Sequence, residues 1–446
     1  MRKRIVELYK ISMPLLFENL FITLMGIIST VMVASVGQHA ISAVGMIDAV
    51  SNLIISVFSA LTVGGTIVVA QYCGRGSTDD ACRAGAQAIV ISAVLSAFIL
   101  LVLAVFRASI IDVLYGRAEP DVIYSANQFM AIVNFSYPLV AVLQTIFGVM
   151  RGSGDTATPM KISVLMNILN VLIGRTLILG LYFIPALGVA GAAYGLLLSR
   201  LIGLVVAAFY IMKRSKTVRI NKLSYFKPDF AVQKVILHFG VPTSIENVLF
   251  QIGRMITQIF VVSMGTAAIM ANSVSMAING FMNVPGTAIT TAVMILVGQR
   301  IGRGDVDDVK KTIKFAAYAC CVSFGALCLA FFPMMGFFLR LYNADAEAAG
   351  MIRQVLSTCY IATPLFWSFS FVISAGLRAA GDVRYTMVVS VLTMFSVRIF
   401  TGYALGLWLG FGVVGVWVGM YSDWFVRGIV YFVRLRSDKW KGKKVI

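Results

Sequence analysis

The hydrophobic residues of this chain form long apolar stretches that short polar segments separate. Twelve stretches reach the length of about 20 residues that a helix needs to cross the hydrocarbon core of a bilayer. Lipid offers the backbone no hydrogen-bond partner, so each stretch is expected to be helical. The pattern predicts an all-α polytopic membrane protein with twelve transmembrane helices. The expected spans are residues 14–36, 45–70, 84–106, 128–150, 161–183, 187–212, 238–263, 272–298, 313–333, 354–377, 385–408 and 411–433.

Polar and glycine positions of the first half recur in the second half at a nearly constant spacing. The offset is 228 positions through the first two spans, 227 in the loop after the fourth span, and 224 before the sixth. An even number of spans separates the copies, so they share one orientation and are parallel repeats. We predict two pseudo-two-fold-related six-helix lobes, at 1–212 and 235–446, joined by a cytoplasmic linker at 213–234. The recurring pairs include Pro14 and Pro242, Glu18 and Glu246, Asn19 and Asn247, Gly37 and Gly265, and Gly191 and Gly415.

The composition and charge support this picture and add an orientation. The chain has 446 residues, of which 59% are hydrophobic and 13% are charged, and its mean hydropathy is +0.89. Its net charge of +18 does not indicate nucleic-acid binding, because the basic residues lie in short segments between spans. With a cytoplasmic N-terminus, 28 of the 37 Lys and Arg residues fall on the cytoplasmic side. This asymmetry predicts that both termini are cytoplasmic and that the main partner is the lipid bilayer.

Cysteine and histidine usage argues against a metal site, a cofactor and an enzyme. The six cysteines show no metal-ligand spacing, and we interpret them as small apolar fillers. The two histidines, His39 and His238, lie far apart in the sequence and form no cluster with acids. A membrane-embedded enzyme would need a clustered nucleophile or His/Asp/Glu set, so we expect no catalytic residues, no metal and no cofactor.

Three polar loops carry a resemblance to a known family. The loop after the second span reads Gln71-x-x-Gly74-Arg75-Gly76-x-x-Asp79-Asp80, and its copy follows the eighth span from Gln299 to Asp308. The loop after the fourth span reads R-G-S-G-D-T-A-T-P-M over residues 151–160. Together with twelve spans, these loops resemble the multidrug and toxic compound extrusion (MATE) family over essentially the whole chain, and most closely its bacterial DinF-like members.

The resemblance implies two lobes arranged as a V, alternating access, and export of amphipathic, often cationic compounds driven by protons or sodium ions. The acids that relatives use for coupling are missing here. Their positions in DinF-like members match Ser29 and Gly174 of this chain, and the position in sodium-coupled members matches Phe250.

The charged residues inside predicted spans are candidates for function, because each is costly to insert into lipid. Glu18, Glu246 and Asp48 are the ion-coupling candidates, with Asp48 near the outer end of its span. Glu18 and Ser29 are eleven residues apart, about three helical turns, and therefore share a helix face. A carboxylate there can exchange a proton or sodium ion for a cationic substrate. It can equally be a structural partner of an arginine near the inner interface, and the sequence leaves both readings open.

Further polar residues within the spans are candidates for a substrate cavity. Among them, the arginines either neutralise the glutamates, which we favour, or attract an anionic substrate group. The polar residues either line a cavity or hold helices together. The candidates are Asn19, Ser29, Asn134, Tyr137, Asn167, Asn170, Arg175, Asn247, Arg254, Thr257, Gln258 and Arg398.

The sequence therefore predicts a proton- or sodium-coupled antiporter that exports small, cationic, amphipathic compounds from a bacterial cell. We expect a monomer in the inner membrane. The alternatives are a lipid-linked oligosaccharide flippase of the same superfamily, which the basic residues within spans favour, a membrane-embedded enzyme, and a passive channel.

Overall fold

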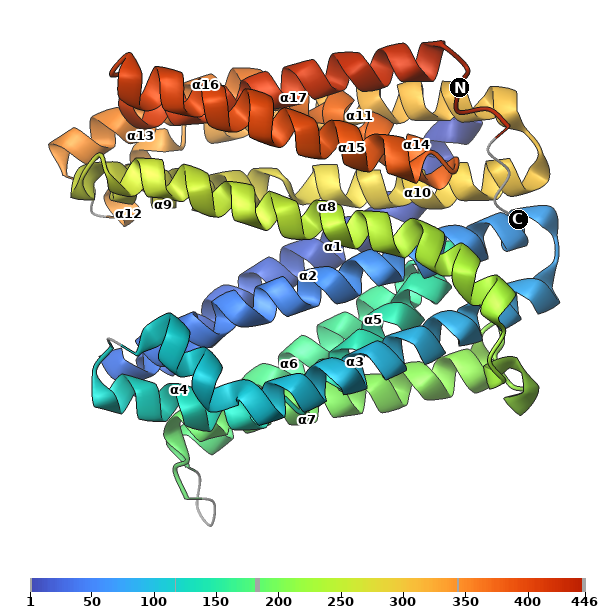
Figure 1. Ribbon diagram of the computed structural model, residues 1–446, viewed down its shortest axis with the longest axis horizontal. Coiled ribbons are helices and arrows are strands. Elements are labelled where there is room, and N and C mark those ends of the chain that lie inside the picture. The colour runs from blue at the N-terminus through green and yellow to red at the C-terminus, as the bar shows by residue number, and fades with distance from the viewer. Residues whose placement is uncertain (1, 117, 181–184, 343–344, 443–446) are drawn as a thin grey trace. The chain divides into compact units, whose positions relative to one another are not determined.

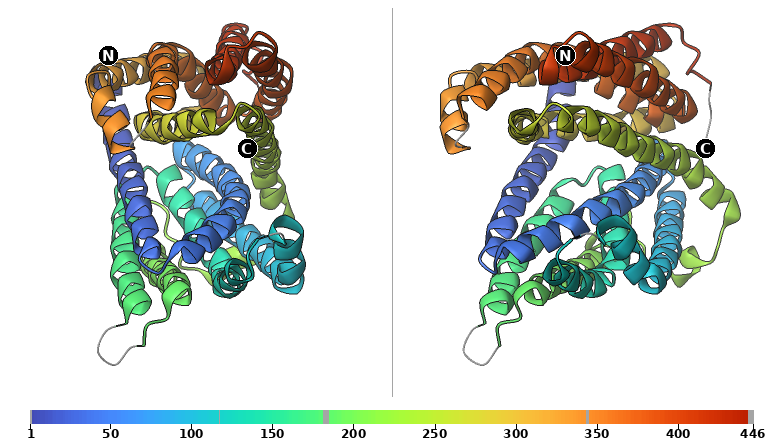
Figure 2. Two further views of the ribbon diagram at one scale, coloured as in Figure 1. Left: turned by 90° about the vertical axis from the view of Figure 1, so that its left-hand side faces the viewer. Right: turned by 60° about the vertical axis from the view of Figure 1, so that its left-hand side comes forward.

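The computed structural model describes residues 2–116, 118–180, 185–342 and 345–442, and these residues form helices without any strand. Figure 1 and Figure 2 show the helices from three directions. The helices of the first half are α1 (Arg2–Ala34), α2 (Gln38–Arg75), α3 (Thr78–Tyr115), α4 (Pro120–Val133), α5 (Ser136–Gly152), α6 (Ala157–Leu179) and α7 (Gly188–Phe209), and the linker holds the short η1 (Tyr210–Arg214) and η2 (Leu223–Phe226).

The second half repeats this order with more interruptions. Several of its helices contain π-helical segments, in which one residue more than usual is fitted into a turn. The elements are α8 (Phe230–Val262), α9 (Thr266–Met282), α10 (Val284–Arg303), α11 (Val306–Phe331), α12 (Met335–Leu341), α13 (Ala346–Ala362), η3 (Thr363–Val372), α14 (Ile373–Ala379), α15 (Val383–Thr393), η4 (Met394–Ile399), α16 (Phe400–Tyr403), η5 (Ala404–Trp408) and α17 (Gly412–Arg436).

Each of the twelve predicted spans falls on one helix or on consecutive helices, apart from positions 181–183 of the fifth span, which lie outside the described residues. Within the described residues, ten helices are long and apolar enough to cross a membrane, and the pair α4 and α5, bent by 47°, makes an eleventh span if it is counted as one. The twelfth predicted span is α17, which carries the buried charges of Asp423 and Arg427. The fold is that of an all-α multi-pass membrane protein.

The eighth predicted span, 272–298, is not one continuous helix. The structure divides it into α9 and α10 at Asn283, directly before a proline in the first turn of α10. Proline lacks a backbone N–H and suits a helix start, so it marks this break. The first and seventh spans are instead longer than predicted, because α1 and α8 continue through Pro14 and Pro242.

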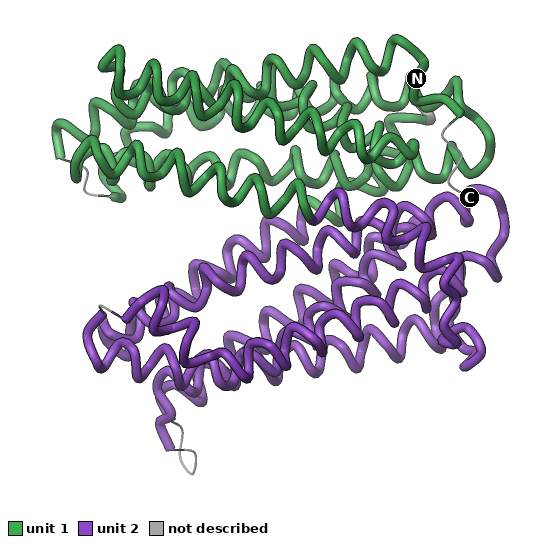
Figure 3. Tube along the Cα trace, viewed as in Figure 1, with its two compact units in different colours: residues 1–16, 245–446 green, residues 17–244 purple. Residues whose placement is uncertain are grey.

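The chain forms two compact units, drawn in different colours in Figure 3. Unit 2 comprises Phe17–Ser244, and unit 1 comprises Met1–Leu16 together with Ile245–Ile446. Both boundaries fall inside a helix, two residues after the proline of α1 and of α8, and they are 228 positions apart. The first turns of α1 therefore belong to the unit built mainly from the second half, and the first turns of α8 belong to the unit built mainly from the first half. The division into lobes at 213–234 stays a prediction.

The repeat is visible in the backbone as well as in the sequence. The helix α2 ends at Gly76 with φ of 83°, and its counterpart α10 ends at Gly304 with φ of 78°. The loops after the fourth and tenth spans place Gly154 and Gly381 at φ of 98° and 101°. Residues with a side chain rarely adopt these values, so glycine is required at the same places in both halves.

Small residues let helices approach closely at equivalent places in both units. A Cβ atom added to Gly195 in α7 would lie 2.6 Å from the Cα atom of Gly174 in α6. A Cβ atom added to Gly419 in α17 would lie 2.6 Å from the backbone nitrogen of Gly402 in α16. Gly195 precedes Gly419 by 224 positions, as the sequence repeat requires, and small residues at such contacts are typical of membrane helices.

Candidate functional site

Unit 2 contains a buried ion pair between the first and fourth spans. The carboxylate of Glu18 on α1 accepts a hydrogen bond of 2.6 Å from Nη2 of Arg151, at the end of α5. Glu18 is 2% exposed, and its second oxygen, Oε2, is buried without a hydrogen bond. The guanidinium of Arg151 also lies over the Phe147 ring. The pair holds α1 to α5 and leaves one acceptor atom unused.

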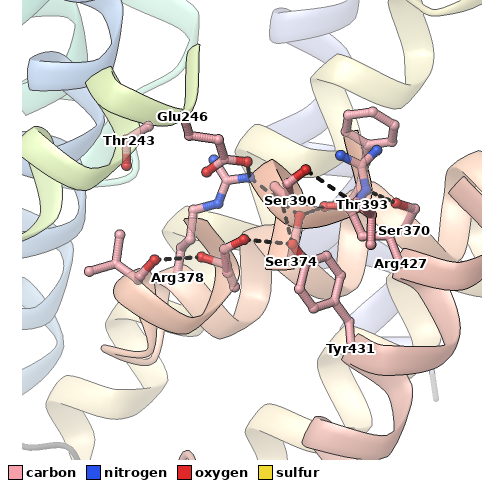
Figure 4. Close-up of polar contacts among 12 residues, drawn as sticks. Thr243, Glu246, Ser370, Ser374, Arg378, Ser390, Thr393, Arg427 and Tyr431 are labelled. Carbon is pink, nitrogen blue, oxygen red and sulfur yellow. Dashed lines mark hydrogen bonds and ion pairs between the residues drawn. The ribbon is translucent and has the colours of Figure 1, made fainter. Parts of the chain in front are cut away.

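Unit 1 contains the same pair at the repeat-equivalent positions. Nη2 of Arg378, in α14, donates a 3.1 Å hydrogen bond to Oε1 of Glu246 on α8. Glu246 is 4% exposed, and its Oε2 is also buried without a hydrogen bond. Figure 4 shows this pair together with Ser374, which accepts a further bond from Arg378. We call Glu18 with Arg151, and Glu246 with Arg378, the two Glu–Arg clamps.

The clamps correct one of our expectations from the sequence. We favoured Arg175, Arg254 and Arg398 as partners of the glutamates. The partners are instead Arg151 and Arg378, at the loops that follow the fourth and tenth predicted spans. Arg175 and Arg254 are exposed, and Arg254 donates to Gln251 on its own helix. The signal was present in the sequence, because Arg151 and Arg378 are themselves a repeated pair at offset 227.

One polar candidate of α1 and one of α6 contact each other within unit 2. Nδ2 of Asn170 donates a 3.4 Å hydrogen bond to Oγ of Ser29, so the two candidates face each other across α1 and α6. Asn167 donates 2.8 Å to the Ser163 carbonyl of its own helix. Asn19 is partly buried on α1, as is its counterpart Asn247 on α8. This group contains no charge.

The candidates nearer the α4–α5 break serve mainly as packing contacts. Tyr137 is fully buried, and its hydroxyl lies 2.8 Å from Oγ of Ser51 on α2. Asn134 is 2% exposed at the end of α4, with its Oδ1 lacking a hydrogen bond. Asp48 is exposed and interacts electrostatically with Arg200 on α7.

The candidates at the outer part of α8 form a short polar chain in unit 1. Oε1 of Gln258 accepts a 2.9 Å bond from Asn272 on α9, and Oδ1 of Asn272 accepts a 2.9 Å bond from the indole of Trp417 on α17. Thr257 is buried and donates its hydroxyl to the Arg254 carbonyl. The first two contacts tie α8, α9 and α17 together.

A second group of charges in unit 1 was only partly foreseen. Asp423 and Arg427, one turn apart on α17, are 0% and 2% exposed. Arg427 donates a 2.6 Å bond from Nε to Ser370 of η3, as Figure 4 shows. Arg398, on η4, is 6% exposed and interacts electrostatically with both residues and with Arg254. Asp423 and Arg427 fall within the last predicted span, 411–433, but the sequence gives no reason to group them with Arg398.

The described residues contain no group of three or more His, Cys, Asp or Glu side chains placed to hold a metal ion. Two repeated helical halves whose helices are long and apolar enough to cross a bilayer define a multi-pass membrane protein.

The MatE family profile matches residues 14–176 and 242–404, and the two matched segments are offset by the 228 positions of the internal repeat. The chain therefore belongs to the MATE family of membrane transporters. Members of this family are not enzymes and need no cofactor.

Curated relatives and solved structures agree with this assignment over nearly the full length. The chain is 27% identical to the uncharacterized transporter YisQ of Bacillus subtilis, over 97% of this chain and 94% of that protein. It is 24% identical to the probable multidrug resistance protein NorM of Thermotoga maritima, over 99% of this chain and 94% of that protein. The flippase alternative gains no support from these comparisons.

Two solved structures illustrate the shared fold. A mutant of the Vibrio cholerae MATE transporter VcmN matches with a TM-score of 0.90 at 19% identity, over 98% of both chains. A MOP superfamily transporter from Pyrococcus furiosus, for which a reverse polarity of the binding pocket is described, matches with a TM-score of 0.88 at 22% identity. It covers 97% of this chain and 95% of its own.

Proposed function

We propose that this protein is a cation-coupled antiporter that exports small amphipathic organic compounds by alternating access. The observation that carries the proposal is the pair of Glu–Arg clamps. Each clamp lies at the same place in its unit, on the helix that begins in the other unit, and each keeps one buried carboxylate oxygen without a partner. A buried acceptor without a hydrogen bond is unfavourable, so each site favours the arrival of a proton or sodium ion.

The clamps suggest how ion binding changes the units. A cation at the unused oxygen of Glu18 or Glu246 competes with the arginine for the same carboxylate. Arg151 or Arg378 is then left with a weaker partner, and the contact between its helix and α1 or α8 loosens. Because α1 and α8 each contribute to both units, loosening a clamp acts on the helices that link them. This couples ion occupancy to the alternation of access.

The charge asymmetry of the loops supports a cytoplasmic location of both termini. The bacterial relatives support a bacterial plasma membrane as the setting, and we propose that the protein acts there as a monomer. Its closer relation to DinF-like members, and its preference for protons or for sodium ions, stay predictions. So does the membership of Asn19, Ser29, Asn170 and the other polar candidates in a substrate cavity.

The predicted preference for cationic compounds needs a different basis from the one the sequence offered. That prediction rested on Glu18 and Glu246 as acids on the presumed cavity faces, and the structure pairs each of them with an arginine. The clamps are therefore assigned to ion coupling, and the organic compound takes its polarity from other groups.

Efflux from proteoliposomes tests the proposal. Wild-type protein and the Glu246→Gln variant are reconstituted with an amphipathic dye, under a proton gradient alone and a sodium gradient alone. We expect gradient-driven efflux by the wild type and a loss of about tenfold or more in Glu246→Gln, which keeps the shape but not the charge of the side chain. Glu347→Gln, at an exposed position of α13, is the matched control and keeps wild-type efflux. Unchanged efflux by Glu246→Gln removes this clamp from the coupling mechanism.

A further inference from the structure

Three arginines from three different helices converge inside unit 1. A Cβ atom added to Gly419 of α17 would lie 2.8 Å from the carbonyl of Arg398, and Asp423 and Arg427 follow Gly419 one and two turns later. A Cβ atom added to Gly253 of α8, the residue before Arg254, would clash with Cε of Met394, one turn before Arg398 on η4. Electrostatic interactions of Arg398 with Arg427, Arg254 and the acid Asp423 accompany these helix contacts. The Glu246–Arg378 clamp adds no net charge, because its two members neutralise each other. Three positive charges and one negative charge therefore meet at membrane depth, where an uncompensated charge is strongly unfavourable.

Arg398 has no hydrogen-bond acceptor within the described part of the chain. Its Nε is buried without a hydrogen bond, on a residue that is 6% exposed. A guanidinium presents its donors in a rigid fork, and here no protein acceptor satisfies that fork.

Arg427 is held more firmly and completes one side of the site. Its Nε donates to Ser370, and its guanidinium lies 4.5 Å from the ring centre of Phe371 and 5.2 Å from that of Phe250. Its Nη2 is 3.8 Å from Oδ2 of Asp423, too long for a hydrogen bond, and is buried without one. Asp423 thus balances one arginine of the three and satisfies the donors of none.

The other half of the molecule shows that helix packing does not require these arginines. A Cβ atom added to Gly419 would lie 2.8 Å from the carbonyl of Arg398, and one added to Gly195 would lie 3.5 Å from the carbonyl of Asn170. Asn170 is therefore the counterpart of Arg398 in unit 2, at offset 228.

The remaining members of the cluster also have uncharged counterparts. The same offset places Gly26 opposite Arg254. The offset of 224 that relates α7 to α17 places Ser199 opposite Asp423 and Gly203 opposite Arg427. Unit 2 thus has uncharged residues at all four positions, and the arginine of its sixth span, Arg200, lies one position after Ser199 and donates to Ser136.

A local change in the backbone accompanies this difference. The offset between the halves is 227 at Met160 and Met387, but 228 at Gly174 and Gly402. The second half therefore has one additional residue between these points, and the π-helical η4, which carries Arg398, lies there. A π-helical turn accommodates such an insertion and is frequent at functional sites.

We propose that Arg398, Arg427 and Arg254 form a binding site for the carboxylate of an amphipathic organic acid. The forked donors of Arg398 match the two oxygens of a carboxylate, Arg427 adds charge from the side, and the exposed Arg254 lies at the accessible edge. Phe371 and Phe250 provide apolar surface beside the charges. The assignment of this ligand as the exported compound rests on the proposed function, while the binding site itself does not.

Equilibrium binding to the purified full-length protein in detergent tests the site. Benzoate is the probe, and benzylamine is its counterpart of similar size and opposite charge. We expect benzoate to bind, with affinity lowered about tenfold or more in Arg398→Gln. We expect affinity raised about threefold or more in Asp423→Asn, because that change removes the one opposing charge. Arg353→Gln, at an exposed position of α13 in the same unit, removes an equal charge and keeps wild-type affinity.

Equal benzoate affinity in wild type and Arg398→Gln, or weaker binding in Asp423→Asn, would overturn the site. If Arg398→Gln does not fold, as judged by size-exclusion chromatography, Arg398→Lys keeps the charge without the fork, and it too is expected to bind benzoate more weakly. Competition with chloride distinguishes a site for organic carboxylates from a site for inorganic anions. If chloride binds more tightly than benzoate, the site is an inorganic anion site and the carboxylate assignment is overturned.

The two proposals fail in different measurements. Benzoate binding without any gradient-driven efflux retains the site and removes the transport function. Efflux of dyes without benzoate binding retains the transport function and removes the site.

Discussion

The two units of this transporter share a scaffold and differ in the charge that the scaffold holds. Both have a Glu–Arg clamp on the helix that enters from the other unit, glycine at the same left-handed loop positions, and the same close glycine contacts. At the middle of the helices, unit 2 has a hydrogen bond between Ser29 and Asn170, whereas unit 1 has Arg398 with Arg427 and Asp423. The features that both units share are therefore those that the fold requires, and the charges around Arg398 are specific to unit 1.

The similarity extends to the segments that follow the last span of each half. In unit 2, Lys222 of the linker lies 3.3 Å from Asp79 at the start of α3. In unit 1, Lys441 of the C-terminal tail lies 3.4 Å from Asp307 at the start of α11. Asp79 and Asp307 are repeat partners at offset 228, so both halves anchor their trailing segment to the same loop.

The largest expected effect comes from removing the arginine of a clamp. Arg151→Leu leaves Glu18 buried without its partner, and we expect this to destabilise the protein by about 3–5 kcal/mol. Arg378→Leu is expected to do the same to Glu246, because both acids are almost fully buried. The apparent Tm of the purified protein measures the loss. Glu18→Gln combined with Arg151→Leu removes both charges and should recover much of it. Strongly unequal losses in the two units would show that the clamps are not equivalent.

A smaller effect is expected from filling the close glycine contacts. Gly195→Val and Gly419→Val place side-chain atoms against neighbouring backbone at about 2.6 Å, and overpacking of this kind costs about 1–3 kcal/mol. The apparent Tm should fall in both variants. Only Gly419→Val should also weaken benzoate binding, because the carbonyl that it displaces belongs to Arg398. A loss of benzoate binding in Gly195→Val would contradict the assignment of the site to unit 1.

The smallest effect concerns the C-terminal tail. A hydrogen bond from Lys310 holds the pKa of the Asp438 carboxyl below its ordinary value of 3.8. A lowered pKa means that the contact stabilises the folded protein above that ordinary value and that the stabilisation is lost as the pH falls through the folded pKa. Asp438→Asn should therefore slightly lower the apparent Tm at neutral pH and have no effect well below pH 3.8. A constant difference across the two pH values would show that the charge is not responsible.

Hydrophobic pattern was sufficient to predict the all-α membrane fold and to place Glu18 and Glu246 within spans, and the resemblance of the three polar loops was sufficient to predict the family. They could not predict which arginines complete the clamps. Arg175, Arg254 and Arg398 lie within predicted spans and were therefore favoured as the nearest partners, whereas the true partners, Arg151 and Arg378, lie in the loops that follow spans. The grouping of Asp423, Arg427 and Arg398 depends on which faces η4 and α17 turn toward each other. The extra residue of a π-helical turn changes the direction of the side chains that follow it, and the hydrophobic pattern does not reveal such a turn.

The exchange of helix ends between the units has a consequence for biosynthesis. Glu7 forms a 2.7 Å ion pair with Arg300, which is synthesised 293 residues later. In unit 2, α2 packs against the start of α8, where a Cβ atom added to Gly64 would lie 2.6 Å from the carbonyl oxygen of Ile236, which belongs to the second half of the sequence. Neither half is therefore complete when its own translation ends. We expect 1–234 and 235–446, synthesised as separate polypeptides, to yield stable protein only when they are co-expressed in one cell.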